Sequence, residues 1–137
     1  MKENLETIEE KFINNILNES ILDSIKKLLN ISKDDTAFDT DVIININSVF
    51  TTLRQLGVGP EKGFRILSNE EKWNDFVSDE LMLNSVKTYV YLKVKLVFDP
   101  PLNSSLMDSF ERQIKELEWR LNVEVESNLN GGESNEQ

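Results

Sequence analysis

The sequence predicts an all-α fold: a small bundle of about five helices with one glycine-rich loop and room for a short extended segment. Apolar residues recur at steps of three and four along most of the chain, which is the spacing of one helix face. The chain has 137 residues, enough for a single domain with its own core. Its few glycines and prolines stand between the periodic stretches, where helices end.

The first two helices are predicted from neighbouring apolar stripes. One stripe covers residues 2–18, and the other begins after Ser20, a residue suited to cap a helix. We assign residues 1–19 as an N-terminal helical extension of a helical domain over residues 20–123. The extension is either a detachable arm that binds a partner or a peripheral helix packed on the same domain.

A third helix is predicted from Asp39 or Thr40, as its cap, to Gln55. Gly57 ends it, because glycine readily adopts the left-handed conformation. The structural loop that follows contains Gly57, Gly59, Pro60 and Gly63. An extended piece at 64–67 and a short helix around 71–76 complete this region.

The next helix is predicted from Ser78 or Asp79 to about Phe98. Residues 89–97 also alternate as a strand would, and their β-branched residues favour a strand. The helical spacing before them is unbroken, so we interpret the whole stretch as a helix that Pro100 and Pro101 terminate.

The last helix is predicted from Asn103 or Ser104 to about Val123. Its stripe has steps of four and three and consists of Leu106, Phe110, Ile114, Leu117 and Leu121. Residues 124–137 are mostly polar and acidic, and we predict a flexible acidic tail there.

Composition excludes several classes of function. The chain has no cysteine and no histidine, so disulfides, thiol nucleophiles and the commonest general base are absent. Acidic residues number 25 against 15 basic ones, a net charge of -10, which disfavours phosphate binding. No apolar run is long enough to span a bilayer, so we expect a soluble protein, intracellular when made, without membrane association.

No motif for catalysis or metal binding stands out. Asp34, Asp35, Asp39 and Asp41 are close together but lack the glycine and glutamate of a calcium loop. The glycine loop follows a helix rather than a strand, and Pro60 removes a donor, so it does not match a phosphate loop. We predict no enzyme, no cofactor and no metal site.

Basic and aromatic residues leave two questions open. Lys87, Lys93 and Lys95 form either a weak basic patch or lysines paired with acidic neighbours.

Tyr89 and Tyr91 are two residues apart, so they cannot both lie on one core stripe, and Trp119 lies off its helix's stripe. These aromatics, with Arg120, are subunit-interface candidates, although ordinary surface aromatics are the alternative.

Several segments resemble one family: FDTD at 38–41, INSVF at 46–50, QLGVGP at 55–60, GF at 63–64, KTYVYLKVKLVFDPP at 87–101 and ELEWRLN at 116–122. Together they resemble the head–tail connector, or head-completion adaptor, proteins of long-tailed bacteriophages of Gram-positive bacteria. The resemblance covers about residues 21–123, and the string at 87–101 is its most specific part. Residues 1–19 look like an addition to the family pattern.

The resemblance implies a dodecameric ring in the virion, beneath the portal protein, joined to the next connector or tail-completion protein. DNA would pass through the ring without specific binding, and the protein would occupy the host cytoplasm during assembly. Val123, Val125 and Leu129 in the tail become candidates for docking to the portal. The alternative from the residues alone is a monomeric acidic interaction or regulatory protein, an inhibitor or nucleic-acid mimic.

Overall fold

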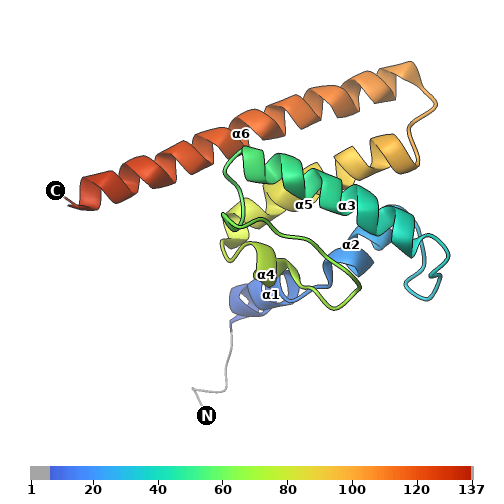
Figure 1. Ribbon diagram of the computed structural model, residues 1–137, viewed down its shortest axis with the longest axis horizontal. Helices are drawn as coiled ribbons and strands as arrows, with labels where there is room; N and C mark the ends of the chain where they lie inside the picture. Colours follow the sequence, from blue (N-terminus) through green and yellow to red (C-terminus); the bar gives the residue numbers. More distant parts are fainter. Residues whose placement is uncertain (1–6, 137) are drawn as a thin grey trace, which may run out of the picture.

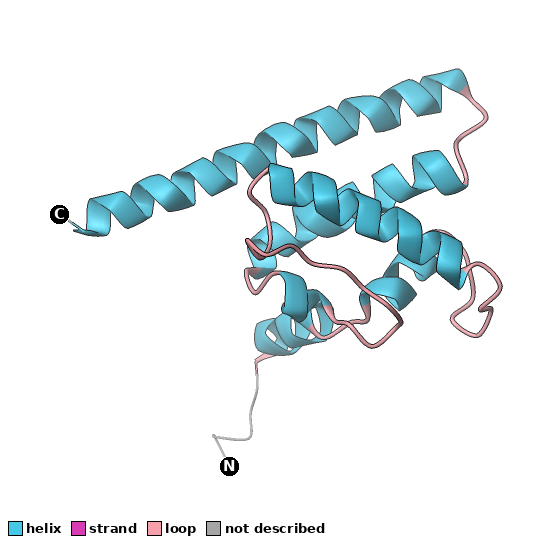
Figure 2. Cartoon of the chain, in the orientation of Figure 1, coloured by secondary structure: helices cyan, strands magenta, loops and turns pink. Residues whose placement is uncertain are grey.

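The computed structural model describes residues 7–136, with the backbone alone for 130–136. Over this range the chain forms six helices and no strand, so the predicted all-α fold is confirmed (Figure 2). The helices are α1 (Ile8–Leu17), α2 (Ile21–Leu28), α3 (Asp39–Gln55), α4 (Trp73–Phe76), α5 (Glu80–Phe98) and α6 (Ser104–Glu136).

Helix α5 is the centre of the bundle. It packs against α3 and α6, and α1 and α2 also contact it. Figure 1 shows α6 running back along α5 and projecting past the body, with α1, α2 and α4 on the side away from α6. The fully buried side chains come from every layer and include Ile21, Ile46, Phe50, Trp73, Val86, Tyr89 and Leu121.

Three helices begin at the capping residues that the sequence predicts. The Ser20 hydroxyl accepts a hydrogen bond from the Asp23 backbone N–H at 3.2 Å. Asp79 caps α5 in the same way, and Asn103 Oδ1 accepts from the Ser105 N–H at 2.8 Å ahead of α6. Each cap satisfies a backbone donor that the first turn leaves unpaired.

Helix α3 does not use Asp39 as its cap, which corrects the prediction. The capping position is Phe38, which makes no side-chain hydrogen bond, and Asp39 lies in the first turn. Asp39 Oδ1 instead lies 2.7 Å from Nζ of Lys26, whose side chain is only 1% exposed. The same ammonium donates to the carbonyls of Lys33 and Asp35 at 3.2 and 2.7 Å. A buried ammonium requires such partners, and this requirement explains why the carboxylate turns inward.

The glycine loop depends on close backbone packing. Gly57 and Gly59 have φ values of 86° and 92°, in the region that favours glycine. A Cβ atom on Gly59 would lie 2.4 Å from Cε1 of the buried Phe76 ring. The loop therefore passes directly over the core.

Residues 64–67 form no strand, and Asn47 holds them in place. Its Nδ2 donates to the Ile66 carbonyl at 2.9 Å, and its Oδ1 accepts from the Ile66 N–H at 2.8 Å. One side chain thus supplies both hydrogen bonds that a neighbouring strand would provide, and the Ile66 side chain is buried.

The helical interpretation of residues 89–97 is confirmed within α5. Val86, Tyr89, Val90 and Val94 are all completely buried. Burial between α3 and α6 therefore outweighs the preference of β-branched residues for strands.

Helix α6 extends beyond its predicted end at Val123 and continues to Glu136. Val125 and Leu129 continue the four-residue spacing from Leu121, and Val125 is partly buried against the core. The predicted end of the last helix near Val123 is therefore wrong, and the flexible acidic tail over residues 124–137 stays a prediction.

Helix α1 lies at the periphery, against α4 and α5. Ile16 and Leu17 pack partly buried against the core, whereas Ile8 and Phe12 are exposed. The connection between α1 and α2 is held to α4, because the backbone N–H of Trp73 donates to the Glu19 carbonyl at 3.1 Å.

Candidate interface surfaces

Tyr89 is not available to a neighbouring subunit, which corrects its place among the interface candidates. Its side chain is completely buried, and its hydroxyl donates to Glu118 Oε2 at 2.6 Å. Burial raises the pKa of the Tyr89 phenol well above its usual range, and the Glu118 carboxylate adds to this effect. The prediction for Tyr89 assumed that α5 buries a single stripe of residues. It buries a wider surface, because α3 and α6 cover two of its sides.

Tyr91 and Trp119 differ in exposure. Tyr91 is partly buried against the core, so only part of its ring could meet a partner. Trp119 is 66% exposed, the one indole on the described surface that the core leaves uncovered.

Trp119 belongs to a surface that two helices form together. Leu81 at the start of α5 is 70% exposed, and Val123 follows Trp119 by one turn of α6. These three side chains, which we call the Trp119 face, line a shallow hollow of about 280 Å³ that Arg120 and Met82 also border. Sequence periodicity identifies Trp119 but not Leu81, because the start of α5 and the second half of α6 are far apart in the sequence and meet only in the fold.

Arg120 is exposed but engaged within its own helix. Its Nη2 lies 2.7 Å from Glu116 Oε1, an i,i+4 ion pair at the surface. Such pairs contribute a few tenths of a kcal/mol, about 0.3–0.5, so the arginine can exchange this partner at little cost.

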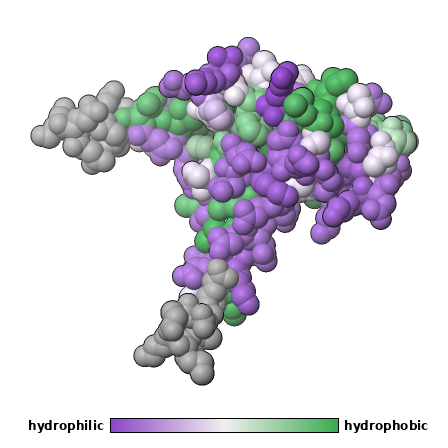
Figure 3. All heavy atoms as spheres, turned by 60° about the horizontal axis from the view of Figure 1, so that its bottom comes forward, coloured by the Kyte–Doolittle hydropathy of each residue, from purple (hydrophilic) through white to green (hydrophobic). Residues whose placement is uncertain are grey.

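The three portal-docking candidates lie at different depths. Val125 packs against the glycine loop, and a Cβ on Gly57 would lie 3.0 Å from its Cγ1. Val123 and Leu129 are exposed. Figure 3 shows hydrophobic side chains on α6 just before its grey end, and a further hydrophobic area on α1.

A second apolar surface lies at the turn between α5 and α6. Val97, Leu102 and Leu106 are exposed there, and the Phe38 and Phe98 rings meet edge to face at 5.6 Å beside them. Helical spacing does not reveal this surface, because Leu102 stands between a proline and a capping residue and belongs to no helical stripe.

The lysines of α5 are paired rather than gathered into a patch. Lys87 Nζ lies 3.1 Å from Glu19 Oε2, and Lys95 Nζ lies 2.9 Å from Asp99 Oδ2. Lys93 Nζ lies 5.9 Å from the centre of the Tyr89 ring.

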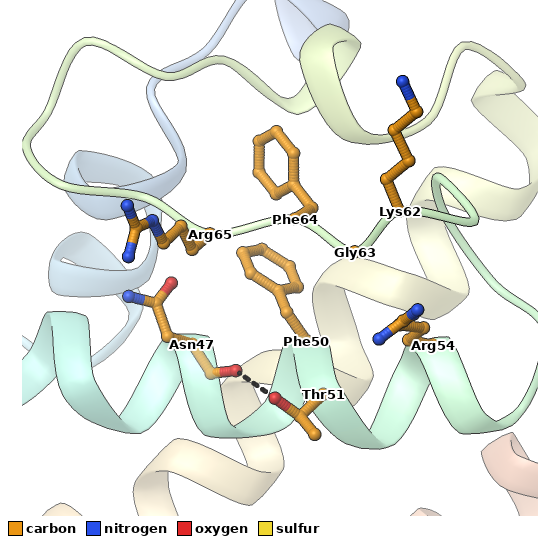
Figure 4. Close-up of a pocket in the computed structure, with 8 residues that line it drawn as sticks. All are labelled: Asn47, Phe50, Thr51, Arg54, Lys62, Gly63, Phe64 and Arg65. Atoms are coloured by element: carbon orange, nitrogen blue, oxygen red, sulfur yellow. Dashed lines mark hydrogen bonds between the residues drawn. The ribbon is translucent and has the colours of Figure 1, made fainter.

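A basic pocket lies elsewhere, between α3 and the loop. Arg54, Lys62 and Arg65 line a cavity of about 550 Å³ together with Asn47, Phe50, Thr51, Gly63 and Phe64 (Figure 4). No sequence pattern predicts this pocket, because a helix and an irregular loop contribute its cations at uneven spacing.

Within the described part of the chain, no three acidic side chains are grouped so as to hold a metal ion. None of the helices described is both long and apolar enough to cross a membrane. Exposed apolar surfaces of this kind are typical of domains that bind other proteins.

Comparison with known families agrees with this class. The profile of the phage connector protein family matches residues 21–128. The chain therefore belongs to the phage connector protein family, whose members are structural proteins of the bacteriophage head–tail connector rather than enzymes. No curated protein and no solved structure gave a match. The family match begins at the first residue of α2, so α1 lies outside it.

Proposed function

We propose that this protein forms an oligomeric ring that joins the phage portal to the next connector or tail component and extends the DNA channel. Membership of the connector family over residues 21–128 is the observation that carries this proposal. A ring of twelve copies fits the resemblance noted from the sequence. The protein resides in the virion at the head–tail interface and in the host cytoplasm during assembly.

The exposed surfaces support a ring. Contacts around a ring are heterologous, so each copy needs two different adhesive surfaces. The Trp119 face is exposed in the single chain and can serve as one of the two, and the exposed apolar surface around Leu102 is available to a further partner. Trp119, Arg120 and the exposed part of Tyr91 remain the subunit-interface candidates.

The charge of the chain supports a passive channel. A net charge of -10 lets DNA pass without being held, since DNA affinity comes largely from cations that displace counterions. Leu129 near the end of α6 is the candidate for contact with the portal that lies outside the Trp119 face, whereas Val123 belongs to that face.

The same charge favours a second candidate function, a monomeric acidic regulator that mimics nucleic acid. The two functions differ in what loss of the gene does to the phage. We expect deletion of the gene to give tailless heads that lose their DNA, together with free finished tails. Normal virions from the deletion would refute the connector function and favour the regulator.

A further inference from the structure

The basic pocket is an unusual feature on this acidic chain. Arg54, Lys62 and Arg65 are exposed, and none of them forms an ion pair with a carboxylate of the described residues. Arg54 Nε donates to the Glu61 carbonyl at 2.9 Å, which fixes the guanidinium beside the pocket. Its two terminal nitrogens have no partner in the described part of the chain.

The pocket combines charge with aromatic surface. Figure 4 shows Arg65 at one end and Arg54 with Lys62 at the other, with the Phe50 and Phe64 rings between them. The centres of the two rings lie 5.4 Å apart. A volume of about 550 Å³ is sufficient for a drug-sized ligand, and therefore for an indole ring. The chemistry suits a surface that carries both an aromatic ring and carboxylates.

The outer face of α6 carries those groups. Trp119, Val123 and Glu126 follow one another at i, i+4 and i+7, so they share one side of the helix. Glu124 flanks Val123, and all four side chains are exposed. The sequence has no lysine or arginine after Arg120, so this end of the helix is uniformly acidic.

A contact between opposite charges would favour self-association of this acidic chain. Two copies that each carry a charge of -10 repel one another unless cations of one meet carboxylates of the other. The basic pocket offers three cations without carboxylate partners, and the acidic end of α6 offers carboxylates next to an exposed tryptophan. The two surfaces are different parts of one chain, as a heterologous contact requires.

We propose that the basic pocket of one copy receives the Trp119 face and Glu124 and Glu126 of a second copy. This inference rests on the proposed ring and names the two surfaces that form its subunit contact. Duplex DNA is the less suitable occupant, since sequence-independent DNA binding needs many cations along an extended face.

Two variants test the contact with the full chain. One, K62E/R65E, removes the pocket and keeps the α6 face. The other, W119A/E124Q/E126Q, removes the face without reversing its charge and keeps the pocket. All five side chains are exposed, and circular dichroism checks that both variants stay helical. K11E/K27E reverses two exposed lysines away from the pocket and serves as the matched control.

Sedimentation velocity at low ionic strength measures the association of each variant alone and of the mixture. We expect each variant alone to associate about tenfold more weakly than the wild type and the control. The mixture should form one-to-one dimers that grow no further, because only one intact contact remains. Absence of a dimer in the mixture would overturn the inference.

Two other results are informative. If the wild type forms rings but the mixture forms no dimer, the proposed contact is wrong and the proposed ring still holds. A dimer in the mixture, with wild-type chains that never close into rings, would contradict the ring and support the contact. Binding of a duplex DNA oligonucleotide to the wild type but not to K62E/R65E would overturn the proposed occupant.

Discussion

Among single residues, Tyr89 makes the free energy of unfolding depend on pH. Its pKa is raised by burial and by the Glu118 carboxylate, so the folded protein keeps the phenol protonated where the unfolded chain begins to lose the proton. Above about pH 10, the ordinary pKa of tyrosine, the unfolded state therefore binds fewer protons. The free energy of unfolding should then fall with rising pH by about 1.4 kcal/mol per pH unit from this group.

Urea unfolding of the wild type and Y89F from pH 8 to 11 measures this contribution. Y89F should lack that part of the slope above pH 10, whereas Y91F, which keeps Tyr89, should retain it. Equal slopes for Y89F and the wild type would show that Tyr89 is not the group responsible.

Asn47 is a second residue whose role becomes visible only in the fold. N47A leaves both backbone groups of Ile66 without their partner, and we expect it to lower the free energy of unfolding by about 1–3 kcal/mol. N45A is the matched control, because the Asn45 side chain donates only to the exposed Asp41 carbonyl. Equal urea midpoints for the two variants would contradict the anchoring role.

At the scale of elements, apolar spacing predicts the positions of the helices but not every boundary or face. The caps at Ser20, Asp79 and Asn103 are readable because a capping bond is local in sequence. Tyr89 is buried because α3 and α6 pack against α5 from different sides. The spacing of apolar residues within α5 does not predict either of these contacts. The basic pocket is similarly assembled from α3 and a loop, so its cations are neighbours only after folding.

The end of α6 tests how far the folded domain extends. Deletion of residues 130–137 retains the contact between the Val125 side chain and Gly57, so we expect an unchanged melting temperature. Deletion of residues 124–137 removes Val125 and should cost about 1–2 kcal/mol of stability. Equal thermal unfolding of the two truncations would show that Val125 contributes nothing.

At the scale of the whole molecule, charge predicts weak interaction with DNA. The net charge is -10, and the lysines of α5 are engaged by Glu19, Asp99 and the Tyr89 ring. We expect no shift of a duplex DNA fragment at micromolar protein and physiological salt. A shift whose salt dependence corresponds to several phosphate contacts would contradict the passive channel.

The central claim is that the chain works as a ring on the portal. The most direct measurement is electron microscopy of the purified protein mixed with purified portal rings, with W119A alongside. We expect an additional ring of density that is coaxial with the portal and open to its channel. W119A should lose that ring while its circular dichroism remains helical. Portal rings without added density, beside a protein that remains monomeric, would contradict the central claim.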